Sequence, residues 1–160
     1  MKTQYSFSFD SKICIKCKAC EIACKQWKGI RAGTIKLRWV EEITSGVFPD
    51  VKRHFTSNSC RHCAQPACLE VCPVQAIVKR PDGIVIVEPE KCNGCQACLQ
   101  ACSFGVPQFA ENGLMQKCDM CVDRIENGQI PVCVGTCPTQ ALRWGTLEEL
   151  ETASMKKQYQ

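Results

Sequence analysis

The sequence predicts an α+β fold in which two small units, one inserted into the other, carry short helices and small hairpins around cysteine-rich loops. Cysteine supplies 16 of the 160 residues, a proportion typical of crosslinked or metal-containing scaffolds. The cysteines also recur in four groups of four. Because cysteine makes up more than a fifth of the hydrophobic class, few apolar side chains are left for a core. We therefore expect something other than their burial to hold the fold together.

The cysteine groups have short, regular spacings that leave no cysteine over. The first and third groups read C-x2-C-x2-C-x3-C, the second reads C-x2-C-x4-C-x3-C-P, and the fourth reads C-x2-C-x11-C-x3-C-P. In chain order, the groups are Cys14, Cys17, Cys20 and Cys24; Cys60, Cys63, Cys68 and Cys72; Cys92, Cys95, Cys98 and Cys102; and Cys118, Cys121, Cys133 and Cys137. The chain therefore carries one unit repeated four times.

The chemistry of cubane iron–sulfur clusters explains these spacings. A short loop can wrap three thiolates that are two residues apart around one 4Fe-4S cluster. If a helical turn begins at the third cysteine, the fourth lies one turn further, about 6 Å along the helix axis, and points towards a neighbouring cluster. In two-cluster ferredoxins the fourth cysteine does ligate the other cluster. The groups are therefore expected to work in pairs, as two ferredoxin-like units that hold four 4Fe-4S clusters through all 16 cysteines.

The residues between the groups predict which groups pair. β-rich runs on both sides of Asp82-Gly83 are typical of a hairpin, which would bring the second and third groups together. The first and fourth groups are then left to pair, and the run CPTQAL after the fourth group matches CPVQAI after the second. The expected division is 1–45 plus 105–150 for the outer unit, 46–104 for the inserted unit and 151–160 for a polar tail.

The remaining segments predict small scaffold elements. Period-two alternation over residues 35–39 and a β-rich run over 51–56 predict a second hairpin, which links the two units. Residues 105–116 are expected to return the chain with little regular structure. A capping-box pattern over 146–149 predicts a short helix that ends near Ala153.

Zinc and disulfides are the rival uses of so many cysteines. Zinc binds CxxC pairs well, but it gives no role to a third cysteine two residues further on and a fourth after three more. The chain also has only two histidines. Disulfides are disfavoured because such close spacings would crowd crosslinks within single turns. The absence of a secretory signal also argues against them.

Charge and hydropathy exclude two classes of partner. Each 4Fe-4S site with four thiolates carries about −2, so four sites would turn the formal charge of +4 into about −4. With no Lys/Arg run either, nucleic-acid binding loses its support. No apolar run exceeds five residues, far short of the roughly 18 that a membrane span needs. We expect a soluble, cytoplasmic chain, although export bound to a signal-bearing partner stays open.

A few polar residues lie among the cysteines. His62 is expected beside a cluster or facing solvent rather than as a ligand, because the thiolates already number four per cluster. Lys16 and Lys18 either raise a cluster's potential through their charge or are simply solvated. Residues 117–124 are expected to form a hydrogen-bonded loop around a cluster.

The whole arrangement resembles the four-cluster iron–sulfur subunits of the dimethyl sulfoxide reductase (molybdopterin oxidoreductase) superfamily. It is also similar to the electron-transfer subunits of formate dehydrogenases, polysulfide reductases and formate hydrogenlyase. The most specific stretches are CRHCAQPACLEVCP at 60–73 and KCDMCVDR at 117–124. Family members commonly have proline where this chain has Ser103, so the backbone beside Cys102 is expected to differ. The chain also ends soon after the fourth group, whereas family members of membrane complexes often have a longer C-terminal extension. By this resemblance, docking on a membrane anchor is not expected.

The resemblance implies four ligand sets in which neighbouring groups exchange their fourth cysteine. The first set is Cys14, Cys17, Cys20 and Cys137; the second is Cys118, Cys121, Cys133 and Cys24; the third is Cys60, Cys63, Cys68 and Cys102; the fourth is Cys92, Cys95, Cys98 and Cys72.

The resemblance also implies a function. We expect an electron-transfer subunit, not an enzyme in its own right, that relays single electrons through four clusters to or from a molybdopterin-containing catalytic subunit. A further redox subunit is a second candidate partner. The alternatives are a free-standing polyferredoxin that shuttles between enzymes and an accessory protein for metalloenzyme maturation.

Overall fold

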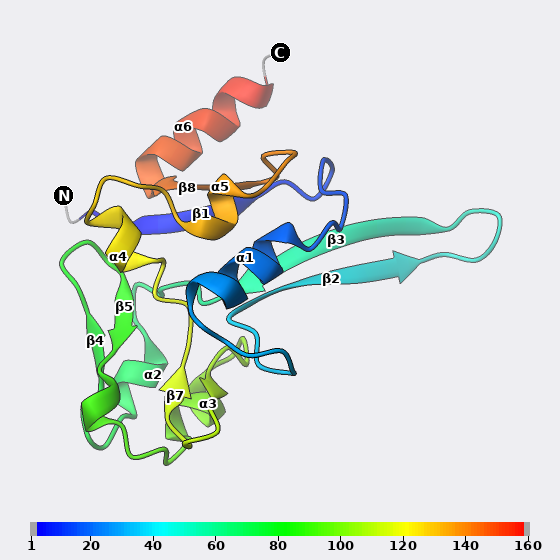
Figure 1. Ribbon diagram of the computed structural model, residues 1–160. Helices are drawn as coiled ribbons and strands as arrows, with labels where there is room; N and C mark the ends of the chain where they lie inside the picture. Colours follow the sequence, from blue (N-terminus) through cyan, green and yellow to red (C-terminus); the bar gives the residue numbers. More distant parts are fainter. Residues whose placement is uncertain (1–2, 159–160) are drawn as a thin grey trace.

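The structure, a computed structural model, describes residues 3–158. Its elements are short helices and antiparallel strand pairs (Figure 1). In chain order they are β1 Tyr5–Phe9, α1 Ala19–Trp27, β2 Arg38–Ser45, β3 Lys52–Ser59, α2 Ala67–Glu70, β4 Ile77–Lys79, β5 Val85–Val87, the 3-10 helix η1 Pro89–Lys91, α3 Ala97–Ala101, β6 Gln108–Phe109, β7 Met115–Gln116, α4 Val122–Ile125, α5 Val132–Gly135, β8 Leu142–Thr146 and α6 Leu147–Gln158. The predicted α+β class with short helices and hairpins is confirmed.

The strands of the described residues form four separate two-stranded sheets. Three are hairpins of consecutive strands, whereas the fourth joins β1 to β8 from opposite ends of the chain, with Tyr5 opposite Thr146. Tyr5 also stacks on Trp144 with ring centroids 4.8 Å apart. The first and last segments of the chain are therefore held side by side, and α6 follows directly beyond β8 (Figure 1).

Two groups of elements surround the cysteine loops. In Figure 1, α2, α3, β4, β5 and β7 lie below β1, β8, α1 and α5. Helix α1 packs on α5, and α2 packs on α3. The β4–β5 hairpin reverses the chain around Asp82-Gly83, as predicted, with Ile77 opposite Val87. It connects the second cysteine group to the third.

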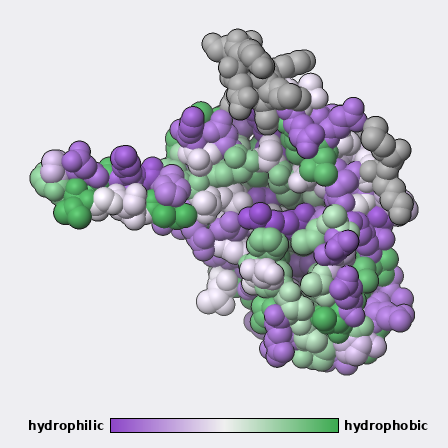
Figure 2. All heavy atoms as spheres, turned by 180° about the vertical axis from the view of Figure 1, so that it is seen from behind, coloured by the Kyte–Doolittle hydropathy of each residue, from purple (hydrophilic) through white to green (hydrophobic). Residues whose placement is uncertain are grey.

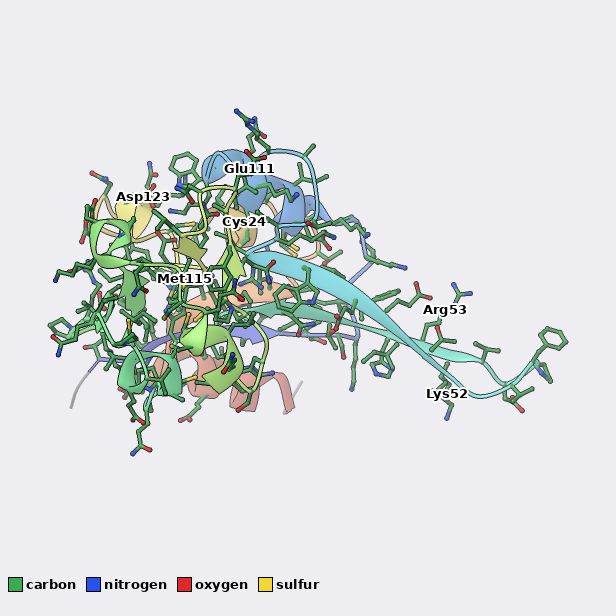
Figure 3. All side chains as sticks on the ribbon, turned by 90° about the horizontal axis from the view of Figure 1, so that it is seen from below. Cys24, Lys52, Arg53, Glu111, Met115 and Asp123 are labelled. Atoms are coloured by element: carbon green, nitrogen blue, oxygen red, sulfur yellow. The ribbon has the colours of Figure 1, made fainter. Side chains whose placement is uncertain are left out.

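The β2–β3 hairpin projects far beyond the rest of the molecule (Figures 1 and 2). The predicted hairpin is confirmed, but its first strand begins at Arg38 rather than Ile35, and the pairing runs further than the sequence pattern indicated, from Arg38 opposite Ser59 to Ser45 opposite Lys52. Its tip carries Val47 and Phe48, which are 81% and 87% exposed. Lys52 and Arg53 lie on the projecting part (Figure 3).

Two predicted segments turn out more regular than expected. Strands β6 and β7 pair within residues 105–116, with Phe109 opposite Met115. The capping box is formed as predicted, because the Thr146 N–H donates to Glu149 Oε2 at 2.8 Å and the Glu149 N–H donates to Thr146 Oγ1 at 3.2 Å. Helix α6 then continues to Gln158, beyond the expected end and into the expected polar tail. No helix in the described part of the chain is both long and apolar enough to cross a membrane.

The buried core is small and contains cysteines. One cluster of buried side chains combines Ile77, Val85 and Met115 with Cys98. A second combines Leu37 with Cys24 and Cys118. Because sulfur atoms occupy positions that aliphatic side chains would take in an ordinary core, the packing of this protein depends on what those thiols bind.

Candidate metal centres

Each cysteine group places its third cysteine at the start of a helix. Cys20, Cys68, Cys98 and Cys133 are the second residues of α1, α2, α3 and α5. This confirms the helical turn predicted from the x3 spacing. The fourth cysteine of each group follows one turn later, which is the arrangement that lets it serve a neighbouring site.

The first loop of each group has the same unusual backbone. The residue before the second cysteine has positive φ in all four groups: Lys16 at 55°, His62 at 47°, Gly94 at 73° and Met120 at 61°. A non-glycine residue in this region costs about 1–2 kcal/mol. Such a conformation in a tight turn forms a nest of backbone N–H groups that favours an anion. Three side-chain-bearing residues therefore accept a strained backbone at a place where an anionic cluster would bind.

The turn after the fourth cysteine is also repeated. Gln75, Gly105 and Gln140 have positive φ, and their N–H groups donate to the carbonyls of Cys72, Cys102 and Cys137 at 3.2, 3.0 and 3.1 Å. The turn after Cys102 has the same left-handed residue and hydrogen bond as the two turns that contain proline, and the expected difference from family members at Ser103 stays a prediction. Gly105 adopts the left-handed conformation without strain, so the turn forms without proline.

Three separate cavities are each lined by four thiols. One is bounded by Cys14, Cys17, Cys20 and Cys137. Another is bounded by Cys60, Cys63, Cys68 and Cys102. The third is bounded by Cys72, Cys92, Cys95 and Cys98. In each cavity three thiols come from one group and the fourth from another, as in the first, third and fourth predicted sets.

The thiols of the second predicted set are all buried. These are Cys24, Cys118, Cys121 and Cys133. Burial, reinforced by Cys133 and Cys121, raises the pKa of Cys24 to about 12. Burial likewise raises the pKa of Cys118, with Cys133 and Cys24 adding to the shift. The four thiols thus lie close enough to act on one another, and ionising them together requires a positive charge that iron supplies.

The arrangement of the thiols suits a cluster better than one ion. Among the described residues, no three His, Cys, Asp or Glu side chains converge closely enough to hold a single metal ion. A cubane cluster is held through a separate iron by each of four thiolates, so its ligands surround a core. A space walled by thiols, with an anion-favouring backbone, fits that group. Which thiol binds which cluster stays a prediction.

Two buried polar side chains, His62 and Lys117, lie next to cysteines in the sequence. The imidazole of His62 is 1% exposed, and its Nδ1 accepts a hydrogen bond from the Val85 N–H at 2.9 Å. Burial, and the charge of Lys117, hold the pKa of His62 well below its ordinary value. Lys117, 6% exposed, lines the cavity of Cys68 and donates to the carbonyls of Val85 and Cys118. His62 is therefore buried, so its solvent-facing alternative is wrong.

Arg38 is a buried cation that the sequence did not single out. It is 1% exposed, and its Nη1 donates to Ser57 Oγ at 2.9 Å. Period-two alternation over 35–39 predicted a strand, and within β2 the buried positions are Arg38 and Val40. An arginine inside an alternating strand was the available signal.

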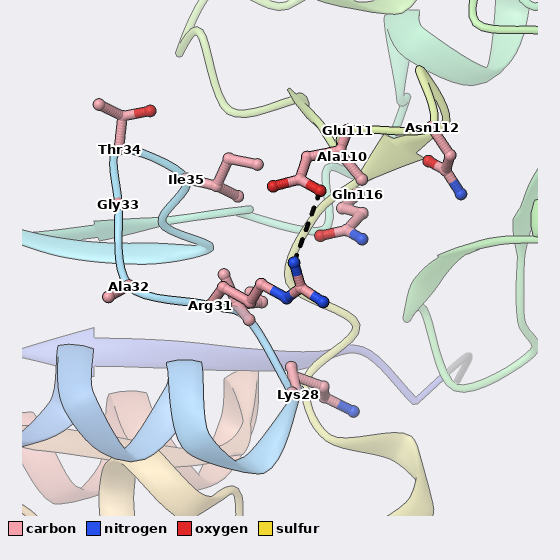
Figure 4. A pocket seen from close by; sticks show the side chains of 12 residues that line it. Lys28, Arg31, Ala32, Gly33, Thr34, Ile35, Ala110, Glu111, Asn112 and Gln116 are labelled. Atoms are coloured by element: carbon pink, nitrogen blue, oxygen red, sulfur yellow. Dashed lines mark ion pairs between the residues drawn. The ribbon is translucent and has the colours of Figure 1, made fainter.

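The half-buried charges near the loops pair with one another. Lys16 forms an ion pair with Glu42 on β2, which offsets its charge beside the first cavity. Lys28 pairs with Asp119 at 2.8 Å, and Asp119 Oδ1 accepts the Cys121 N–H at 3.0 Å. These bonds support the interpretation of residues 117–124 as a hydrogen-bonded loop. A separate open hollow between residues 28–35 and 110–116 contains no cysteine (Figure 4).

Comparison with known proteins agrees with this geometry. The family model of the 4Fe-4S dicluster domain matches residues 51–147. A protein of Escherichia coli K12 named probable anaerobic dimethyl sulfoxide reductase chain YnfG is 43% identical over 159 residues, covering 94% of this chain and 77% of that protein. The chain belongs to the 4Fe-4S dicluster family.

Other members of the dicluster family extend the comparison. A chain of the anaerobic dimethyl sulfoxide reductase of Haemophilus influenzae is 43% identical, covering 93% of this chain and 77% of that protein. The formate dehydrogenase iron-sulfur subunit of the same organism is 35% identical, covering 94% of this chain and 54% of that protein. As a family member, the protein carries 4Fe-4S clusters, and its 16 cysteines fit four of them.

Proposed function

We propose that this protein is an electron-transfer subunit that relays single electrons through four 4Fe-4S clusters to or from a molybdopterin-containing catalytic subunit. The observation that carries the proposal is the division of 12 cysteines among three cavities of four thiols each, with the remaining four buried together. Its relatives are named as a chain of anaerobic dimethyl sulfoxide reductase and as the iron-sulfur subunit of formate dehydrogenase. Both names support a role as one subunit of a larger oxidoreductase.

The proposed ligand sets are those named from the resemblance. The cavity linings support the first, third and fourth sets. The second is supported by the effect of Cys133 on the thiol pKa values of Cys24, Cys118 and Cys121. When bound, each cluster supplies one reversible electron transfer. The protein holds the clusters with fixed thiolates and keeps water from the buried second site.

Two nested units remain the proposed organisation of the chain. The outer unit would comprise 1–45 and 105–150, and the inserted unit 46–104. Pairing of β1 with β8 supports the outer unit, because residues from both ends then lie in one sheet. The β4–β5 hairpin between the second and third groups supports the inserted unit. The proposed boundary between 45 and 46 falls at the end of β2, in the loop of the projecting hairpin.

The exposure of the thiols supports an order of the four sites along the path of the electrons. Cys17 in the first set and Cys95 in the fourth are exposed, whereas all four thiols of the second set are buried. Lys117 connects the second and third sets, since it precedes Cys118 and lines the cavity of the third. Electrons would therefore enter and leave through the first and fourth sites. Such a relay needs no catalytic side chain of its own.

The cytoplasm is the proposed compartment, because all 16 cysteines are proposed as cluster ligands and must stay reduced until iron and sulfide arrive, as a reducing environment allows. Fractionation of cells, with the protein detected by antibody, tests this directly.

Anaerobic purification from the native source tests the function. We expect brown protein with about four iron and four acid-labile sulfide per site, in a stoichiometric complex with a molybdenum-containing subunit that reduces or oxidises its clusters. Colourless, folded protein that contains zinc would overturn the cluster proposal. A monomer that exchanges electrons with several unrelated enzymes would favour a free-standing polyferredoxin. Full activity of the finished enzyme without this protein would favour an accessory role in maturation.

A further inference from the structure

Arg38 lies at the boundary between the first and second cysteine sets. Its hydrogen-bond partner Ser57 lines the cavity of the first set. Its other neighbour, the ring of Phe7, lies 4.4 Å from the guanidinium carbon and packs against the buried cluster that contains Cys24 and Cys118 of the second set. The guanidinium therefore contacts one residue that lines the first site and one that packs against the second.

The backbone on either side of Arg38 supports the same placement. Leu37 packs with Cys24 and Cys118, while Val40 lines the first cavity together with Ser57. Strand β2 thus passes between the two sites. Arg38 is the charged residue that the strand buries there.

The guanidinium is incompletely bonded. Its Nε and Nη2 atoms are buried and have no hydrogen-bond partner among the described residues. Leaving such donors unsatisfied costs about 1–3 kcal/mol each, and more for a charged group. A buried arginine is therefore retained only where something supplies acceptors and negative charge, and the structure offers four nearby thiols, Cys133, Cys118, Cys20 and Cys24, on which its charge acts.

We propose that Arg38 is a shared positioning cation for the first and second clusters, which donates from Nε and Nη2 to their sulfur atoms and raises both reduction potentials. The inference rests on the proposed function, since it needs clusters in both sites. Adding an electron makes a cluster more negative, and a buried positive charge beside it stabilises the reduced state with little screening. One residue would then raise the reduction potentials of two neighbouring clusters together.

Redox titration followed by electron paramagnetic resonance, on the full-length holoprotein, tests this role. We expect Arg38→Gln to lower two of the four cluster potentials, each by at least a tenfold change in the one-electron equilibrium constant, which is 59 mV. The other two potentials should not change. A shift in none, in one or in all four clusters would overturn the proposal.

Arg31→Gln is the matched control. It removes the same charge from a side chain that is 88% exposed and 3.8 Å from the equally exposed Glu111 (Figure 4). Because solvent screens this charge, all four potentials should equal those of the unmodified protein.

A second variant covers a failure of assembly. Iron and sulfide are counted first, and if Arg38→Gln lacks any of its clusters, Arg38→Lys decides by the same criterion. Lysine keeps the positive charge but not the planar set of guanidinium donors. We therefore expect the potentials of two clusters to fall by less than in Arg38→Gln. Any other pattern overturns the proposal. Unmodified protein without clusters would instead refute the proposed function, so the two failures are distinguishable.

Discussion

The exchange of the fourth cysteine between groups can be tested at single residues. Cys24→Ser should remove one cluster, because serine is a poor ligand for a cubane iron. If Cys24 completes the second set, adding Cys118→Ser removes nothing more, whereas adding Cys14→Ser removes a second cluster. Iron and sulfide per chain, measured after anaerobic purification, distinguish these double variants. Ligation of Cys24 within its own group predicts the opposite pattern.

The pH dependence of cluster loading follows from the buried thiols. Burial raises the pKa of Cys68 to about 11 and that of Cys24 to about 12, so both thiols keep their protons at neutral pH when no iron is bound. Iron binding must release those protons, and the affinity therefore rises with pH until the pH passes these values. We expect iron retained against a fixed chelator concentration to increase between pH 6.5 and 8.5. Retention that falls over this range would contradict the assignment.

At the scale of elements, the β2–β3 hairpin has two functionally different ends. Its base supplies Val40 and Ser57 to the first cavity, whereas the tip residues Val47 and Phe48 are almost fully exposed. Figure 2 shows this tip standing clear of the body. The base therefore belongs to the cluster sites, and the tip does not.

Shortening this hairpin should leave the clusters in place. Replacing residues 46–51 with Asn-Gly, the preferred two-residue turn, removes the tip while Ser45 still faces Lys52. We expect unchanged iron content and unchanged potentials in this variant. Val40→Asp at the base is the contrasting variant, because it places a negative charge beside an anionic site and should lower the iron content. Loss of iron from the shortened hairpin would show that the tip matters for assembly.

The sequence predicted the elements with strong local signals. Turn chemistry at Asp82-Gly83 and the capping box at Thr146 act within a few residues, and both are observed. The helical turn at the third cysteine was also predictable, because the x3 spacing separates the third and fourth cysteines by about one turn of helix. The extent of β2 and β3 was not, since those strands are held by pairing with each other more than by an apolar pattern.

What the sequence missed depends on distant segments. The left-handed backbone of Lys16 and His62 contradicts ordinary residue preference and follows from the shape of the ligand loop. Arg38 is buried near thiols from two distant groups, Cys20 and Cys24 in the first and Cys118 and Cys133 in the fourth. No local pattern carries that information.

For the whole molecule, the small core predicts that iron holds the fold together. The two groups of packed, buried side chains that form the core contain few aliphatic residues, and cysteine thiols complete them. We expect chelation under anaerobic conditions to abolish cooperative thermal unfolding, as followed by circular dichroism, and to make the protein sensitive to protease. Reconstitution with iron and sulfide should restore both properties. An iron-free protein that melts cooperatively at the same temperature would contradict this dependence.

The pairing of β1 with β8 governs the order in which the protein can be completed during synthesis. Cys14, Cys17 and Cys20 leave the ribosome early, but Cys137, which lines the same cavity, emerges only near the end. The second and third groups are translated together well before it. Throughout most of translation, the nascent polypeptide therefore exposes three N-terminal thiols whose site still lacks its fourth cysteine. Delivery of iron and sulfide must wait for the last strand, or the earliest cysteines need protection from oxidants until it arrives.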